Sequence, residues 1–399
     1  MKNDNLIITR AKNQFLYSGN RKILDFSLSS GAMILGHSNK IYCKSVREQL
    51  NKGSNYSNKN INEVDYIKSL KKKFKEFDNF IFSNSGSEAN IRALRISRTT
   101  KNKEIVAMVN GSWHGSVDNF MFDFKNGKKI IPNKIKSLSS GIDHLKKSVL
   151  LIPYNDIKLT KKILDKYHKK ISAIVIEPIQ CGIPYKKSNN YLKFLEKYCR
   201  SKKIILWFDE VITGMRVRDY AVYKQFKLKP DIVTFAKCFG GGMPLGLTMF
   251  NSKLIMNSKK KIFFGGTFSG NPLSTKVGLD TFTFIKKNKK KIDKHINYLS
   301  NLLKNEINYH CKEQKINFKI QSFESIARPI FSSQEINNRF LREKFDPNFK
   351  NSLKLKAYLL KKNIFISSNC CFFISYCHNK RDINNLINIL KDFLSKNHS

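Results

Sequence analysis

Short apolar runs alternate with amphipathic stretches through the middle of the chain. The runs are four to six residues long and rich in Ile, Val and Phe, which is typical of strands buried on both faces of a sheet. They are Phe80–Ser83, Ile105–Val109, Ile171–Ile176, Ile204–Phe208 and Ile232–Phe235. Helical patterns such as Glu88–Arg98 and Tyr191–Ser201 lie between them. This alternation predicts an α/β fold with a mostly parallel sheet.

The pattern changes after this region. Asp280–Lys312 predicts a long helix, and the last hundred residues mix short strands with helices and end in the helical stretch Arg381–Leu394. No internal repeat and no Pro- or Ser-rich linker separates the two regions. We therefore expect a second, smaller α/β domain that follows the first without a flexible connection.

The charge balance is extreme. Lys and Arg number 74 against 30 Asp and Glu, which gives a net charge of +44 and a pI near 9.9. The lysines are scattered, and runs such as Lys71–Lys73 and Lys289–Lys291 lack interleaved aromatics or a nucleic-acid-binding motif. A solvated basic surface is therefore favoured over a nucleic-acid interface. Anionic ligands should still be attracted, and less strongly at high salt.

Neither end of the chain predicts export or membrane insertion. The N-terminal apolar run, Leu6–Ile8, is too short for a signal-peptide core, and no run approaches the roughly 18 apolar residues of a membrane span. We expect a cytoplasmic protein. The eight cysteines are scattered without metal-ligand spacing, so we expect free thiols, mostly in the core, and no metal site.

Polar residues follow the predicted strands, at the sheet edge where ligands bind in parallel α/β folds. Asn84–Ala89 follows the first run and contains Ser85, Gly86 and Ser87 ahead of a helix. Small residues there let backbone N–H groups converge on an anion at a helix N-terminus. An ordinary N-cap made by Ser85 or Ser87 explains the same pattern.

Two charged residues follow two other strands. Asp209 comes directly after Ile204–Phe208, and Lys237 comes just after Ile232–Phe235. A carboxylate or an amine buried at a strand end is costly unless it is paired, and burial makes a lysine more nucleophilic. Each residue is therefore either a structural ion or a functional group. About one helix and one strand separate them, so they can lie on adjacent strands and face one site.

An anion cradle, a carboxylate and a lysine together match the needs of pyridoxal 5′-phosphate. Its phosphate needs N–H donors, its ring nitrogen needs an acid, and its aldehyde needs a lysine for a Schiff base. Trp113 follows Ile105–Val109 and can stack on the ring. A core aromatic is the alternative for Trp113, and a structural histidine is the alternative for His114.

Eight motifs along most of the chain carry a family resemblance. They are Ile34–His37, Asn84–Ala89, Trp113–Gly115, Tyr154–Asp156, Glu177-Pro178, Phe208–Gly214, Lys237 with its glycine turn, and Gly266–Pro272. In this order they resemble the class III pyridoxal-phosphate-dependent aminotransferases, and most closely the glutamate-1-semialdehyde 2,1-aminomutase branch.

The resemblance implies fold type I of the PLP-dependent transferases. An N-terminal segment (1–44) would pack with the small domain. A large PLP-binding domain (45–275) would contain the mostly parallel central sheet, and a smaller α/β C-terminal domain (276–399) would follow. Lys237 would form the Schiff base and move the proton, and Asp209 would keep the ring nitrogen protonated.

The resemblance also implies how the cofactor is held. Val211 and Trp113 would pack on the two faces of the ring, and the phosphate would bind to residues Ser85, Gly86 and Ser87. His114, Glu177 and Ile212 complete the expected cofactor-binding set. Thr267 would reach the phosphate from a neighbouring subunit, which implies a homodimer; without the family, a plain turn is the favoured interpretation of Thr267. Gln180 is the candidate for the cofactor's 3′-oxygen, because Ile212 is apolar.

Three departures from the aminomutase bear on the substrate. The chain begins with residues that match the segment after the aminomutase's substrate-binding arginine, so Arg10 is not its equivalent. Cys370 stands where the aminomutase has a glutamate, and the gating loop between Phe122 and Leu151 is shorter. We therefore expect transamination from an amino-acid donor, with glutamate favoured, to an aldehyde or ketone acceptor that is anionic or sugar-derived.

Other functions stay open. Within the cofactor class they are the aminomutase itself or a PLP-dependent lyase. From a different class comes a catalytically inactive polyanion-binding protein, against which intact Lys237 and Asp209 argue. Arg216 and Arg328 are candidates for binding an anionic substrate, and salt bridges at the surface or an interface are the alternative for both.

Overall fold

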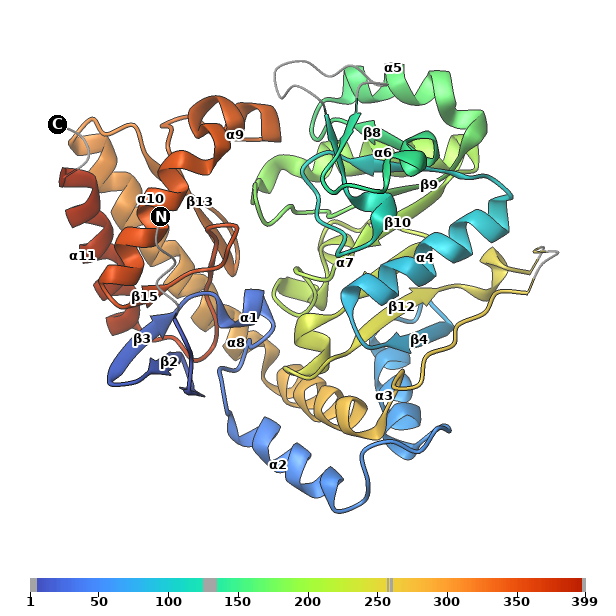
Figure 1. The fold of residues 1–399 in the computed structure, drawn as a ribbon, viewed down its shortest axis with the longest axis horizontal. Coiled ribbons are helices and arrows are strands. Elements are labelled where there is room, and N and C mark those ends of the chain that lie inside the picture. Colours follow the sequence, from blue (N-terminus) through green and yellow to red (C-terminus); the bar gives the residue numbers. More distant parts are fainter. Residues whose placement is uncertain (1–5, 125–134, 257, 259–260, 397–399) are drawn as a thin grey trace.

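The computed structural model describes residues 6–124, 135–256, 258 and 261–396, and a seven-stranded sheet forms the centre of its larger lobe (Figure 1). The order is β4-β12-β11-β10-β9-β5-β8. These strands are β4 (Asn79–Ser83), β5 (Ile105–Val109), β8 (Val149–Ile152), β9 (Ile171–Ile176), β10 (Ile205–Asp209), β11 (Ile232–Phe235) and β12 (Gly246–Phe250). Only β12 runs antiparallel to its neighbours, so the predicted mostly parallel α/β sheet is confirmed.

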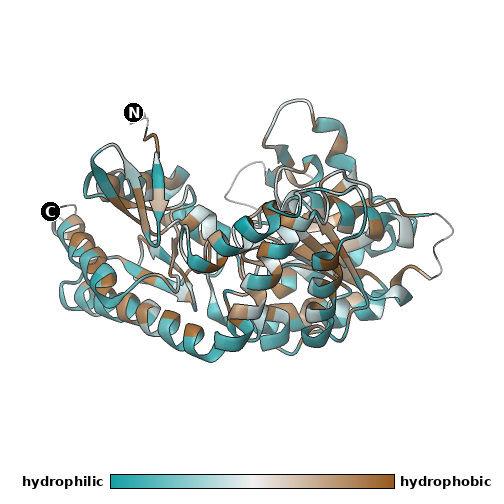
Figure 2. Ribbon diagram, turned by 90° about the horizontal axis from the view of Figure 1, so that it is seen from below, coloured by the Kyte–Doolittle hydropathy of each residue, from teal (hydrophilic) through white to brown (hydrophobic). Residues whose placement is uncertain are grey.

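All five apolar runs form strands of this sheet. Two strands, β8 and β12, were not predicted. Alternate residues of each strand point to opposite faces, and along β9 Ile174 and Ile176 join one hydrophobic cluster while Ala173 and Val175 join another. Both faces are therefore covered, as the continuous apolar runs indicate, and hydrophobic residues concentrate in the strands and on the inner sides of the helices (Figure 2).

Helices pack on this sheet from both sides. α4 contacts β9, β11 and β12, α6 contacts β10, and α5 contacts β8. The helices of this lobe are α2 (Lys40–Leu50), α3 (Ile61–Lys73), α4 (Gly86–Lys101), α5 (Ile157–Tyr167), α6 (Asn189–Lys202) and the short α7 (Val222–Gln225). A small hairpin of β6 (Phe122–Phe124) and β7 (Ile135–Ser137) lies outside the main sheet. The predicted helices Glu88–Arg98 and Tyr191–Ser201 fall within α4 and α6.

The long helix α8 (Pro272–Glu313) runs from the larger lobe into the smaller one (Figure 1). It packs against α2 and α3 near its start and against α11 and β13 further along. Asn271 caps its first turn by accepting a hydrogen bond from the Ser274 N–H (2.8 Å), and Pro272 occupies the first helical position, where its missing N–H costs nothing. The expected limit between residues 275 and 276 thus falls inside a continuous helix.

The smaller lobe combines both ends of the chain. Its antiparallel sheet is β13 (Lys319–Phe323), β14 (Ile326–Ile330) and β16 (Phe372–Phe373). A second sheet joins β1 (Arg10–Lys12), β2 (Phe15–Ser18) and β3 (Arg21–Asp25) to β15 (Ile364–Phe365). Its helices are the short α1 (Leu28–Gly31), α9 (Arg339–Phe345), α10 (Lys350–Lys361) and α11 (Lys380–Lys396). The N-terminal strands therefore pair directly with the C-terminal region.

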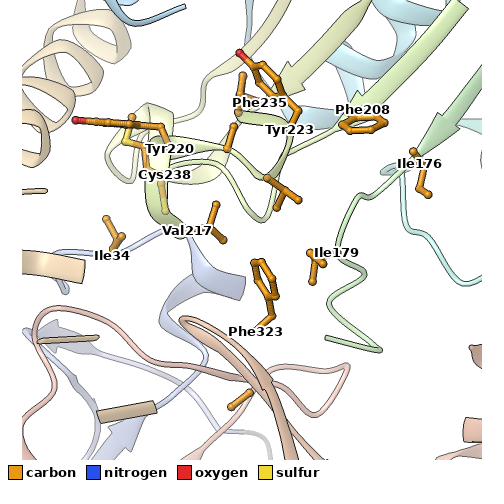
Figure 3. Packing of buried hydrophobic residues seen from close by; sticks show 14 of the residues in the cluster. Ile34, Ile176, Ile179, Phe208, Val217, Tyr220, Tyr223, Phe235, Cys238 and Phe323 are labelled. Atoms are coloured by element: carbon orange, nitrogen blue, oxygen red, sulfur yellow. The ribbon is translucent and has the colours of Figure 1, made fainter. Parts of the chain in front are cut away.

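One hydrophobic core continues from lobe to lobe. Figure 3 shows Ile34 of the N-terminal segment, Val217 and Cys238 of the larger lobe, and Phe323 of the smaller lobe gathered in the same cluster. Because these side chains are buried against one another, the two lobes are held together by apolar packing. No helix of the described ranges is both long and apolar enough to cross a bilayer.

We predict that Gly278→Ala destabilises the protein. A Cβ at Gly278, in α8, would lie 2.6 Å from the Phe239 carbonyl oxygen and 2.8 Å from Cε1 of Tyr66. A helical Gly→Ala change otherwise favours folding by about 1 kcal/mol, whereas this overlap should cost about 1–3 kcal/mol. Urea unfolding should therefore show a net loss. Lys287→Ala, exposed on the same helix, is the control and should leave stability unchanged; a stabilised Gly278→Ala variant would contradict the packing argument.

Candidate active site

A pocket of about 250 Å³ opens at the carboxyl edge of the sheet, where β10 and β11 end and α4 begins. Asp209 is the last residue of β10, and Lys237 follows β11 after one intervening residue. The two strands are neighbours and parallel, with Asp209 in register with Thr234. The predicted placement of Asp209 and Lys237 on adjacent strands is therefore confirmed. The pocket is lined by Asn84, Ser85, Gly86, Ser87, Asn90, Trp113, Gly115, Asp209, Val211, Ile212, Ala236, Lys237, Met243, Pro244 and Leu245.

Asp209 is almost completely buried, and hydrogen bonds from three elements hold its carboxylate. Oδ2 lies 2.7 Å from Nδ1 of His114 and accepts a hydrogen bond from Nδ2 of Asn90 at 2.8 Å. Oδ1 accepts from the Val211 N–H at 3.0 Å. Asn90 also donates to the His114 carbonyl oxygen (2.9 Å). These donors offset the cost of burying the carboxylate and fix its direction.

The N-terminus of α4 forms the opposite wall of the pocket. Ser85 caps the helix by accepting from the Glu88 N–H (3.1 Å), and Glu88 in turn accepts from the Asn84 N–H (2.7 Å). This resembles a capping box, except that the glutamate reaches the residue before the N-cap, and the N-cap interpretation of Ser85 is correct. Among the described residues, none accepts a hydrogen bond from the N–H groups of Gly86 or Ser87. These two donors and the helix dipole remain available for an anion.

Gly86 is needed for close packing at this wall. A Cβ there would lie 3.1 Å from both γ-carbons of Val211. The hydroxyl oxygen of Ser87 accepts from the Ser116 N–H (3.1 Å), which orients the side chain and leaves its O–H able to donate. Gly86 and Ser87 therefore offer backbone N–H groups, and the hydroxyls of Ser85 and Ser87, although both accept a hydrogen bond, can each still donate one.

Trp113 stands at the mouth of the pocket and is 53% exposed. The backbone N–H of Trp113 donates to Oε2 of Glu177 at 2.9 Å. Glu177 is buried, and burial together with the nearby Asp209 carboxylate raises its pKa to about 8, against the lowering effect of the Trp113 hydrogen bond and of Lys237. Glu177 is thus mostly protonated at neutral pH and positions the backbone of Trp113.

Several predicted site residues lie outside this pocket in the structure. His114 and Glu177 sit behind it, in contact with Asp209 and Trp113. Thr267 is exposed and does not line the pocket of its own chain. Gln180 is completely buried and donates to the Asn110 carbonyl oxygen (3.0 Å) and the Ser112 hydroxyl (3.1 Å), so the structure does not place it in the pocket.

Arg216 and Arg328, the two candidates for binding an anion, are both buried and do not line the pocket. Arg216 is buried and donates to the carbonyl oxygens of Gly31 (2.6 Å) and Ile374 (3.3 Å) and to the Ser375 hydroxyl (3.2 Å), joining the two lobes. Arg328 is equally buried and donates to the Asn369 carbonyl oxygen. No described carboxylate forms an ion pair with either guanidinium. The salt-bridge interpretation is therefore wrong for both residues within the described chain, neither residue lines the pocket, and their role in binding an anionic substrate stays a prediction.

Sequence reasoning missed several lining residues. Asn90 is one helical turn beyond Gly86, so a helix starting at Gly86 places both on one side. This four-residue spacing could have identified Asn90 as a pocket residue from the sequence. The turn that follows Lys237 brings Met243, Pro244 and Leu245 to the pocket. The direction in which the chain leaves this turn is known only from the folded structure.

A sequence profile described as Aminotransferase class-III matches residues 1–323. The chain belongs to the class III aminotransferase family. Two curated relatives, both named glutamate-1-semialdehyde 2,1-aminomutase, come from Nitrosopumilus maritimus and Methanosphaera stadtmanae. The first is 30% identical and covers 92% of this chain and 86% of its own, and the second is also 30% identical and covers 97% and 90%.

Solved structures of similar proteins share the fold. An omega-transaminase from Sphaerobacter thermophilus superposes with a TM-score of 0.89 at 20% identity, over 97% of this chain and 90% of its own. A glutamate-1-semialdehyde aminomutase from Pseudomonas aeruginosa superposes with a TM-score of 0.86 at 18% identity, over 98% and 87%. These likenesses agree with fold type I of the PLP-dependent transferases.

Pyridoxal 5′-phosphate is the cofactor of this family, and the pocket residues fit its parts. The free N–H groups of Gly86 and Ser87 suit the phosphate, and the fixed carboxylate of Asp209 suits the protonated ring nitrogen. Trp113 offers an exposed aromatic face for a flat ring, and Lys237 supplies an amine for the aldehyde. Each chemical demand of the cofactor thus has a described residue beside the same cavity.

The raised pKa of Glu177 predicts a pH-dependent effect of Glu177→Gln on stability. The folded state keeps a proton on Glu177 up to about pH 8, whereas the unfolded chain loses it near 4.5. The wild-type protein therefore loses stability as the pH rises through this window, and the glutamine variant does not. Urea unfolding of the cofactor-free proteins at pH 6 and pH 9 should show the variant gaining about 2 kcal/mol relative to wild type. A constant difference between the two pH values would show that Glu177 ionises normally.

Proposed function

We propose that the chain is a PLP-dependent aminotransferase that moves an amino group from an amino-acid donor, glutamate, to an aldehyde or ketone acceptor. The observation that carries the proposal is the convergence of Lys237, Asp209 and the N-terminus of α4 on one pocket. Membership of the class III family supports the reaction class. The net charge of +44 favours an anionic acceptor, for example a phosphorylated or acidic sugar.

When bound, the cofactor supplies an electron sink for the bond that breaks at the substrate's amino carbon. Asp209 would hold a proton on the ring nitrogen, and its three hydrogen-bond donors keep the carboxylate aimed at that position. Nζ of Lys237 would take a proton from the substrate's amino carbon and deliver it to C4′ of the cofactor. Trp113 and Val211 would enclose the two faces of the ring and exclude water.

The position of Cys370 favours ordinary transamination over an internal amine shift. Cys370 stands where the aminomutase branch has a glutamate, and its thiol is fully buried, 3.5 Å from the Ser352 carbonyl oxygen. It therefore supplies no carboxylate to the pocket. The shortened gating loop is only partly described, because residues 125–134 lie outside the described ranges.

The aminomutase is the second candidate, and one observation favours it. The curated relatives at 30% identity carry that name over nearly the whole chain. An aminomutase converts glutamate 1-semialdehyde without any second substrate, whereas an aminotransferase needs an amino donor and a separate acceptor.

We also propose a homodimer in which each subunit completes the other's site. Around Thr267 the side chains of Phe263 and Phe268 are 74% and 60% exposed, which is unusual for large aromatics. Arg92 holds this segment by donating to the Gly265 carbonyl oxygen (3.2 Å) and the Ser269 hydroxyl (2.8 Å). A second copy would cover the aromatic side chains and place the partner's Thr267 beside the phosphate.

The test is an absorption spectrum of the purified, cofactor-loaded protein before and after addition of L-glutamate without any acceptor. A visible-edge band that shifts towards the pyridoxamine form, with one 2-oxoglutarate released per site, is the expected result. Turnover of glutamate 1-semialdehyde with no other amino compound present would instead establish the aminomutase. No cofactor band after reconstitution would overturn both and favour the polyanion-binding alternative, which salt-sensitive DNA binding would then test.

Substitutions at the two charged residues should separate attachment from turnover. Lys237→Ala should abolish covalent attachment of the cofactor, measured by borohydride trapping and mass spectrometry, without unfolding the protein. Asp209→Ala should keep some cofactor and lose most turnover. Asp209→Asn keeps the size of the side chain and one acceptor oxygen, but it removes the charge and turns an NH2 group towards at least one present donor, so its rate should fall on the order of 10²-fold. Near wild-type rates in either Asp209 variant would refute the assignment of the ring-nitrogen partner.

A further inference from the structure

Two cysteine thiols meet where the lobes join. Cys181 lies in the larger lobe, in the loop after β9, and Cys371 lies in the smaller lobe, just before β16. Their sulfur atoms are 3.1 Å apart, although 190 residues separate them in the sequence. A disulfide bond is about 2.05 Å long, so an approach of about 1 Å would bring the two sulfurs to bonding distance.

The surroundings of the pair favour a thiolate on Cys371. The Cys181 thiol donates to Sγ of Cys371, and Nη1 of Arg328 lies 3.7 Å from the same sulfur. Sγ of Cys371 also lies 2.9 Å from the Cys181 carbonyl oxygen, to which it donates while it carries its proton. Burial raises the pKa of Cys371, but the contacts with the Cys181 thiol and Arg328 outweigh it and lower the pKa to about 7. In the described structure, Nε and Nη2 of Arg328 have no hydrogen-bond partner. A negative sulfur beside this buried guanidinium offsets a charge that no carboxylate neutralises.

The neighbouring Cys370 has a different environment. Its thiol contacts only backbone carbonyl oxygens, those of Ser352 (3.5 Å) and Ser368 (4.0 Å). Burial raises its pKa to about 11. Cys370 is therefore a matched control, since it is adjacent in sequence and equally buried but has no thiol partner.

We propose that Cys181 and Cys371 are an oxidation site that hydrogen peroxide converts into a reversible disulfide between the two lobes. The Cys371 thiolate attacks one peroxide oxygen, the O–O bond breaks, and hydroxide leaves and is protonated to water. The sulfur of Cys181 then attacks the resulting sulfenic acid, so that the S–S bond forms, the S–O bond breaks and a second water leaves. The two thiols together lose two electrons, and one peroxide gains them and becomes two waters. A dithiol reductant then reduces the disulfide back to two thiols.

The location ties this bond to the active site. Cys181 and Cys371 form a small apolar cluster with Ile326 and Phe373, and Ile212 packs against that cluster while also lining the cofactor pocket. A disulfide there would fasten the smaller lobe to the wall of the pocket. We expect it to slow any reaction that requires the lobes to move, a consequence that rests on the proposed function, whereas formation of the bond does not.

The experiment treats the cofactor-loaded protein with hydrogen peroxide at pH 7, quenches it with an alkylating agent under denaturing conditions, and counts free thiols by mass spectrometry. The wild-type protein, with eight cysteines, should lose two thiols and yield a cross-linked pair of peptides containing residues 181 and 371, both reversed by dithiothreitol. Cys370→Ser should behave like wild type. Cys181→Ser should form no cross-link and instead accumulate oxygen adducts on Cys371. A different cysteine pair, or unchanged thiols at peroxide levels that oxidise free cysteine, would overturn the proposal.

A second measurement tests the consequence. The rate of the glutamate-induced spectral change should fall at least fivefold in oxidised wild type, recover with dithiothreitol, and stay unchanged in peroxide-treated Cys181→Ser once its Cys371 adducts are reduced. A cross-linked enzyme with an unchanged rate would overturn the effect on the active site. If glutamate gives no spectral change even in the reduced protein, the proposed function fails, while the thiol count still decides whether the disulfide forms.

Discussion

The buried carboxylate of Asp209 is the constraint on which the geometry of the site depends. A charge at the end of a central strand is tolerated only if enough donors surround it, and they come from α4, from the loop after β5 and from the turn after β10. The same helix that supplies Asn90 also presents the free N–H groups of Gly86 and Ser87. The hydrogen bonds that hold the Asp209 carboxylate therefore also fix the position of the N–H groups of Gly86 and Ser87 relative to Lys237.

The helix α4 extends this control beyond the pocket. Arg92, two residues after Asn90, holds the segment that contains Thr267 through Gly265 and Ser269. Arg92 also donates to the carbonyl oxygen of Phe82 in β4, so it binds to the sheet as well. One helix thus orients the acid, the cradle and the segment that we propose reaches the neighbouring subunit, because its residues are held rigidly by their own backbone hydrogen bonds.

The junction of the lobes is built differently from the pocket. Apolar packing around Val217 and Phe323 supplies most of the contact, and Arg216 adds hydrogen bonds to Gly31, Ile374 and Ser375. All three acceptors are uncharged, so hydrogen bonds rather than an ion pair hold the Arg216 guanidinium among the described residues. No carboxylate of the described residues pairs with Arg328 either, and its Nη1 lies 3.7 Å from Sγ of Cys371. Buried cations with few acids nearby are in keeping with a chain that has 30 acidic residues against 74 basic ones.

The α/β class, the five apolar strands and the residues that follow them could be predicted without the structure, because strand burial and strand-end chemistry are local properties of the chain. The sequence also indicated that Asp209 and Lys237 face one site. Four features came only from the tertiary structure. They are the reversed direction of β12, the hydrogen bonds of Gln180, the role of Arg216 and the contact between Cys181 and Cys371. Each depends on a partner far away along the chain, and no periodicity or spacing encodes which distant groups a buried polar atom will meet.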